Sequence, residues 1–220
     1  MFNRAIYKAH ALDQLKNRWV APCIVTASII AISIGLNFAS SLLGNSEIGE
    51  KLIQLILIIS ICFSGIARMV LAYVHLKLSR STTPVTADDV LVAIGEYSVK
   101  GILGSLWYCL WVFLWSLLFY IPGIVKGIAY SQMFFVMIEN PDIGPKKAMN
   151  ISKVMTDGHK ADLFVMNLSF LGWGILAMLS GGIGLIWLVP YYMTTASNAY
   201  TAIKTEALNT GKLSVADFAN

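Results

Sequence analysis

The residues that could do chemistry in this sequence are few, because most of its polar side chains are separated by long apolar runs. Charged groups within hydrocarbon are costly, and where they persist they often mark the path of an ion or substrate. Lys126, for example, is the single charged residue in 101–138. Five polar side chains within such runs are our candidate site residues: Arg68, Lys126, Tyr130, Asn167 and Asn198.

These side chains could line one polar crevice if the helix predicted at 123–139 packs against the last apolar helix. A crevice holding Lys126, Tyr130 and Asn198 would suit an anionic headgroup or a peptide carboxylate. Two plainer interpretations stay open. The long stems of Arg68 and Lys126 can carry their charges to the membrane surface, and the asparagines can join neighbouring helices by hydrogen bonds.

Motifs for catalysis or metal binding are absent from the sequence. It has no His-Glu-x-x-His, no Gly-x-Ser-x-Gly and no glycine-rich phosphate loop, and its three cysteines lack metal-ligand spacing. Acidic residues are also missing from the middle of the predicted spans, which argues against transport coupled to protons or sodium. We therefore expect no enzymatic activity, no metal and no cofactor.

The composition indicates where these residues must be held. Of the 220 residues, 57% are apolar and only 13% are charged, compared with the 45–50% apolar residues typical of soluble chains. These values exclude a disordered chain, a nucleic-acid-binding module and the core of a soluble enzyme. An all-α membrane protein is predicted, since a run of about 20 apolar residues crosses a bilayer as a helix.

The apolar runs predict a single membrane domain over 1–220, with six spans arranged as three hairpins. The predicted spans are 20–43, 52–76, 101–121, 123–139, 161–179 and 183–204. Short amphipathic helices are expected at the membrane surface before the first, third and fifth spans, and the first of them occupies 1–19. Pro122-Gly123 and the stretch 180–184 are expected to form the tight turns of the last two hairpins.

Single residues also predict where helices begin, end and pack. Thr86, with two acids after it, is expected to start the second surface helix, and Pro145 and Gly158 are expected to bound the third. Glycines such as Gly101 and Gly172 are expected to allow helices to approach closely.

Basic residues predict the orientation of these spans. Thirteen lysines and arginines lie in the N-terminal segment, in the connections 77–100 and 140–160, and in the tail 205–220 or just before it. The opposite side holds Lys51 and could also hold Lys126. Because basic loops stay in the cytoplasm, both termini are expected there.

The last hundred residues also carry a recognisable pattern. Its parts are Ile121-Pro122-Gly123-Ile124-Val125-Lys126, Tyr130-Ser131, Glu139-Asn140-Pro141, Gly158-His159-Lys160, Leu168-Ser169-Phe170-Leu171-Gly172-Trp173 and Pro190-Tyr191. This pattern resembles the domain-of-unknown-function 975 family of bacterial integral membrane proteins. The resemblance implies a six-helix protein of a bacterial plasma membrane, and it carries over no catalytic residue because the family has no assigned activity.

Two functions from different classes follow from the sequence. The first is a non-enzymatic membrane component that acts through contacts with lipid, or with another membrane protein or peptide. An accessory subunit, an envelope-stress factor and an immunity protein are examples. The second is a small transporter or exporter of a small molecule, lipid or peptide, suggested by the similarity between the last two hairpins. A nucleic-acid partner is not expected.

Overall fold

The computed structural model describes residues 2–43, 46–118 and 120–218, and this part of the chain is helical and contains no strand. The elements are α1 (Arg4–Leu15), α2 (Val20–Ser41), α3 (Glu47–Arg80), α4 (Ala87–Leu118), α5 (Tyr120–Ala129), α6 (Met133–Glu139), α7 (Pro145–Met155), α8 (Lys160–Leu179), α9 (Leu185–Asn209) and the short 3-10 helix η1 (Val215–Phe218). The predicted all-α class is therefore confirmed.

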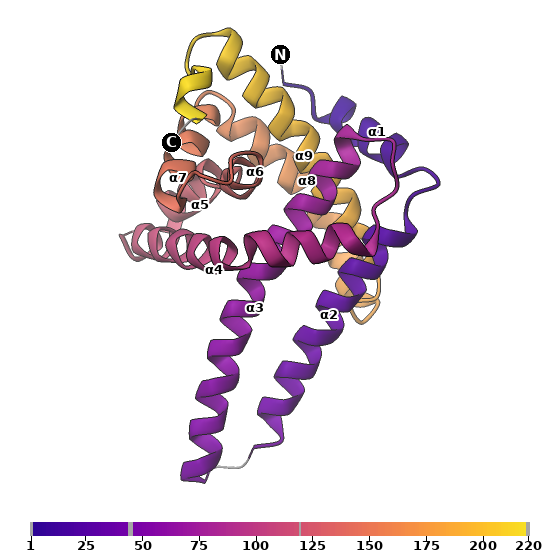
Figure 1. The fold of residues 1–220 in the computed structure, drawn as a ribbon, viewed down its shortest axis with the longest axis vertical. Coiled ribbons are helices and arrows are strands. Elements are labelled where there is room, and N and C mark those ends of the chain that lie inside the picture. Colours follow the sequence, from indigo (N-terminus) through magenta and orange to yellow (C-terminus); the bar gives the residue numbers. More distant parts are fainter. Residues whose placement is uncertain (1, 44–45, 119, 219–220) are drawn as a thin grey trace.

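Five segments are long and apolar enough to cross a membrane. They are Val20–Ser41, Glu47–Arg80, Ala87–Leu117, Ile121–Glu139 and Lys160–Leu179. Helix α9, which contains the sixth predicted span at 183–204, is not among them. Figure 1 shows α2 and α3 running side by side beyond the other helices. Their outer halves carry exposed isoleucines and leucines, such as Ile34 on α2 and Ile58 on α3.

Helix α4 differs from the prediction of a surface helix followed by a separate span at 101–121. It runs without a break from Ala87 to Leu118, and Gly101 lies inside it. At this position α4 crosses α3 so closely that a Cβ atom built on Gly101 would lie 2.6 Å from the carbonyl oxygen of Gly65. Gly101 is thus a packing position within a continuous helix, where it lets two backbones meet.

The predicted span at 123–139 also differs, because it is formed by two helices. Helix α5 ends at Ala129 and α6 begins at Met133, with turn residues between them. The hydroxyl groups of Ser152 and Thr156 donate hydrogen bonds to the carbonyl oxygen of Ala129, at 2.8 and 3.2 Å. Side chains near the end of α7 therefore satisfy the backbone at the break, which allows the apolar run to bend.

Two helices expected at the membrane surface pack against the rest of the protein. Helix α7 buries Ala148, Met149 and Ile151 in the main core, which also contains all of α6 from Met133 to Ile138. Helix α1 packs against α9, where the amide of Asn198 donates to the side-chain oxygen of Gln14 at 2.9 Å. Protein therefore covers the apolar residues of α7, whereas Ile6 and Leu12 of α1 remain 47% and 48% exposed.

The turn of the last hairpin lies at its predicted position, whereas Pro122-Gly123 lies inside a helix. Gly181 and Gly182 adopt positive φ angles of 69° and 86°, between the end of α8 and the start of α9. Pro122-Gly123 falls in the first turn of α5, where proline is well tolerated. A Cβ atom on Gly123 would lie 3.0 Å from the Cα atom of Ser116, so α4 and α5 form a closely packed pair.

Candidate functional site

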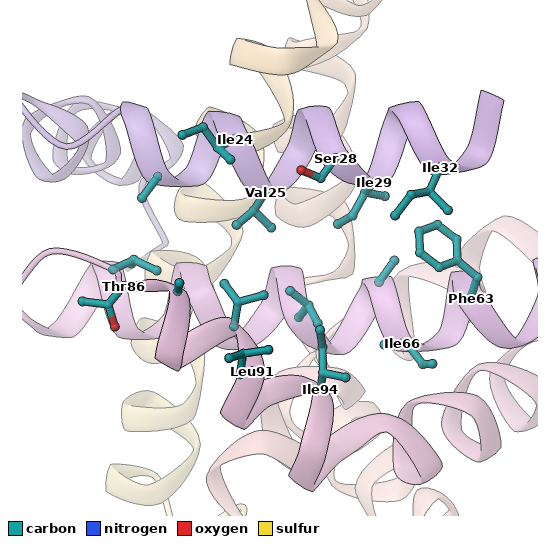
Figure 2. A pocket seen from close by; sticks show the side chains of 16 residues that line it. Ile24, Val25, Ser28, Ile29, Ile32, Phe63, Ile66, Thr86, Leu91 and Ile94 are labelled. Carbon is teal, nitrogen blue, oxygen red and sulfur yellow. The ribbon is translucent and has the colours of Figure 1, made fainter. Parts of the chain in front are cut away.

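The candidate site is an apolar groove of about 490 Å³ between α2, α3 and the beginning of α4. Ser28 and Thr86 are its only polar lining residues, and none of the residues that line it is charged. Figure 2 shows side chains from the three helices facing the same space. The lining residues are Ala21, Ile24, Val25, Ser28, Ile29, Ile32, Phe63, Ile66, Ala67, Val70, Val85, Thr86, Ala87, Val90, Leu91 and Ile94.

A capping arrangement at the start of α4 positions the third wall of this groove. The backbone N–H and the hydroxyl of Thr86 both donate to the Asp89 carboxylate, at 2.8 and 3.0 Å. Lys77 of α3 forms an ion pair with the same carboxylate. The sequence predicted that this helix begins at Thr86, and the ion pair adds what the sequence did not show, namely contact with α3.

The groove is open on one side and is suited to a hydrocarbon chain. Ile24 and Leu91 line it and remain 59% and 65% exposed, so a chain entering from outside would cover apolar surface. Its volume falls within the range of small-molecule sites in proteins, which is about 300–1,000 Å³. With no charged lining group, the groove offers burial of apolar surface as its main source of affinity.

The five polar residues proposed from the sequence have separate surroundings. The guanidinium of Arg68 lies over the rings of Tyr108 and Phe134, with its central carbon 5.4 and 5.7 Å from their centroids. The ammonium of Lys126 lies 4.3 Å from the centroid of a Trp115 ring. Both cations are therefore held against aromatic faces, in keeping with cation–π attraction.

The remaining three candidates join helices. The Tyr192 hydroxyl donates to Asn167 at 3.1 Å, which links α8 to α9, and Asn198 links α9 to α1. Tyr130 is buried in the main core, at the break between α5 and α6. Lys126 and Tyr130 are joined only through the backbone, by a hydrogen bond of 3.0 Å, and no side-chain hydrogen bond between any two of the five is found among the described residues. Their contacts agree with the plainer interpretation of polar groups that hold helices together.

A smaller cavity of about 230 Å³ places Arg68 beside Asn37. It lies between α2 and α3, and its polar lining also includes three serines, Ser33, Ser60 and Ser64. Its ten lining residues include no carboxylate. This cavity is more polar than the apolar groove, and the sequence analysis chose its arginine as a candidate site residue.

An ion-pair centre at Glu139 was missed by the sequence analysis. Its carboxylate pairs with Arg80 of α3 and Lys204 of α9, and it accepts a hydrogen bond from the Tyr200 hydroxyl. The Glu139 side chain is only 9% exposed, so three elements meet around a nearly buried charge. The signal in the sequence was the charge of Glu139, Arg80 and Lys204, each of which lies at or near the end of a long apolar segment.

Comparison with known proteins bears on the second half of the chain. Residues 120–207 match a family described as a protein of unknown function (DUF975). The chain carries a DUF975 region. The resemblance inferred from the sequence is thus confirmed over these residues, which run from α5 to most of α9.

The DUF975 match includes Glu139, Tyr200 and Lys204 but not their partner Arg80. It also excludes the groove, whose lining residues all precede residue 95. No curated protein and no solved structure matches the chain. The family description names no activity, so the site must be interpreted from its own chemistry.

Proposed function

We propose that the chain is an integral protein of a bacterial plasma membrane that acts without catalysis, by holding a lipid acyl chain between α2, α3 and α4. The observation that carries this proposal is the open apolar groove, because all three of its helices are long and apolar enough to enter a bilayer. A groove on such helices faces hydrocarbon, and an acyl chain is its most abundant occupant there.

The arrangement of the chain ends supports an orientation with both termini in the cytoplasm. The Phe2 ring lies 5.9 Å from the His159 ring, and His159 contacts Glu206 near the end of α9 at 3.0 Å. The two ends therefore lie together, as Figure 1 also shows, away from the connection between α2 and α3. Basic residues are concentrated in these terminal and connecting segments, which favours the cytoplasmic side.

A transporter is the second candidate, and the cavity beside Arg68 is the observation that favours it. An arginine within an apolar helix could bind an anionic substrate. The cavity holds only about 230 Å³, however, and Arg68 already lies over two aromatic rings. The larger apolar groove is therefore the stronger basis for a function.

Filling the groove with Ile24→Trp is expected to reduce lipid binding. If the larger ring displaces about two methylene groups, the loss is about 1.6 kcal/mol, or roughly tenfold in affinity. Native mass spectrometry of the full chain purified in mild detergent would count retained lipid molecules. Ile34→Trp is the matched control, because Ile34 lies on the same helix with 63% exposure and does not line the groove.

The proposal predicts that the wild type and Ile34→Trp retain more lipid than Ile24→Trp does. Equal retention by the two variants would show that lipid does not occupy the groove, and would contradict the proposed function.

A further inference from the structure

A second hollow, of about 350 Å³, lies where the end of α7 and the start of α8 meet the C-terminal segment. The residues that line it are Lys153, Val154, Asp157, Lys160 and Lys212. Three lysines and one aspartate make this hollow strongly positive. None of its residues belongs to the apolar groove, so it is a separate site on the molecule.

The Asp157 carboxylate neutralises only part of the positive charge of these lysines. Lys160 donates to its carboxylate at 3.0 Å, and the Lys212 ammonium donates to its backbone oxygen at 3.0 Å. The hydrogen bond from Lys160 is the main cause that lowers the pKa of Asp157 below its ordinary value, so this carboxylate stays charged. Lys153 donates no hydrogen bond to another described residue, and its ammonium is available to an incoming anion.

Lys126 does not line the hollow, but it adds positive charge to its surroundings. It lies within electrostatic range of Lys153 and Lys160, although the sequence analysis left open that it faced the opposite side of the membrane. Gathering like charges raises the electrostatic free energy, and an anion bound among them lowers it. The side chains therefore favour a ligand with at least one full negative charge.

Apolar surface next to the lysines indicates the source of that anion. Lys126 contacts Trp115 of α4, and Leu117 and Ile121, which follow Trp115 within six positions along the chain, are 72% and 73% exposed. A ligand with both a phosphate and long hydrocarbon chains could use both surfaces, whereas a soluble phosphate could use only the lysines. Lysine suits such a ligand because its compact charge requires no fixed geometry from the phosphate.

We propose that this basic hollow binds the phosphate of an anionic phospholipid whose acyl chains lie along the exposed face of α4 and α5. The proposal goes beyond lipid binding in the groove, because it assigns a headgroup chemistry to a different site. Basic residues near a membrane each contribute substantially to the attraction of anionic lipids. Affinity should therefore depend on the charge of the lipid at this hollow, and not at the groove.

The test is a titration of the full chain in neutral detergent with phosphatidylglycerol and with phosphatidylcholine, followed by native mass spectrometry. The wild type should prefer phosphatidylglycerol, and Lys153→Gln/Lys160→Gln should weaken its binding by about tenfold or more. Lys153→Gln alone should give a smaller loss in the same direction, and this single change breaks no hydrogen bond to a described residue. Ile24→Trp should leave the preference for phosphatidylglycerol unchanged, which separates this site from the groove.

Lys16→Gln/Lys51→Gln is the matched control, because it removes the same charge from two exposed lysines outside the hollow. An equal loss in this control would show a general effect of net charge and would overturn the proposal. Glycerol 1-phosphate is a further competitor. It should not displace phosphatidylglycerol, and if it competes as well as the lipid does, a soluble phosphate is the ligand and the lipid assignment is wrong.

Discussion

Replacing Gly101 by alanine is expected to lower the free energy of unfolding by about 3 kcal/mol, the upper part of the usual range for overpacking. The added Cβ atom would lie 2.6 Å from the carbonyl oxygen of Gly65 and 2.7 Å from a carbon of Met69. A backbone oxygen cannot rotate away as a side chain can, so α3 and α4 would have to separate. Thermal unfolding of the purified chain, followed by tryptophan fluorescence, would measure the loss.

Gly95→Ala is the matched control on the same helix, since a Cβ atom there meets no other atom within 4 Å. Alanine favours helix over glycine by about 0.8–1.0 kcal/mol, so this variant should be slightly more stable than the wild type. The two substitutions should thus have opposite signs. Equal behaviour of Gly95→Ala and Gly101→Ala would mean that α3 and α4 do not meet at Gly65.

Glu139→Gln is expected to lower the free energy of unfolding by about 2 kcal/mol. Removing one partner of a buried ion pair costs about 3–5 kcal/mol, because it leaves a charge unpaired. The cost is lower here since water can solvate the remaining cations, Arg80 and Lys204, whose side chains are 42% and 22% exposed. Chemical denaturation of the purified chain, followed by circular dichroism, would measure the difference.

Glu47→Gln provides the comparison for an exposed pair. Glu47 and Lys51 form an ion pair at 2.8 Å, but their side chains are 83% and 71% exposed, and such pairs contribute about 0–1 kcal/mol. Should Glu139→Gln prove no more harmful than Glu47→Gln, the Glu139 centre would not join α3, α6 and α9 as described.

Features determined by neighbouring residues could be predicted from the sequence. The beginning of α4 followed from Thr86 and the acids after it, and the beginning of α7 followed from Pro145. Gly158 was expected just after the end of α7, and it adopts a φ angle of 90°. In each case one side chain or one backbone angle satisfies the end of a helix, so sequence alone carries the information.

Features determined by distant residues could not be predicted in this way. Gly101 looked like the start of a span, because its close approach to Gly65 depends on how two helices cross. Gly172 was assigned the same packing role, yet a Cβ atom there would meet nothing within 4 Å. Glycine spacing therefore indicated close approach in one helix and misled in another.

The candidate site residues show the same difference between what is local in the sequence and what depends on distant residues. The five polar residues were found because charge and polarity are visible in a sequence, but their partners lie far along the chain. Asn198, for example, contacts Gln14 across 184 positions. The apolar groove gave no such signal, because its lining residues look like those of any apolar span. A site that is defined by the shape of an apolar surface can be recognised only when the positions of the helices in three dimensions are known.

The central claim, that the α2–α3 pair lies in membrane hydrocarbon, is tested most directly by spin labelling. Ile58→Cys, in a chain whose native cysteines are replaced, places a nitroxide on a side chain that is 58% exposed on α3. In reconstituted vesicles, power saturation should show greater access to oxygen than to a water-soluble nickel chelate, with the reverse at Lys16→Cys. Equal access to the nickel chelate at both positions would contradict membrane insertion.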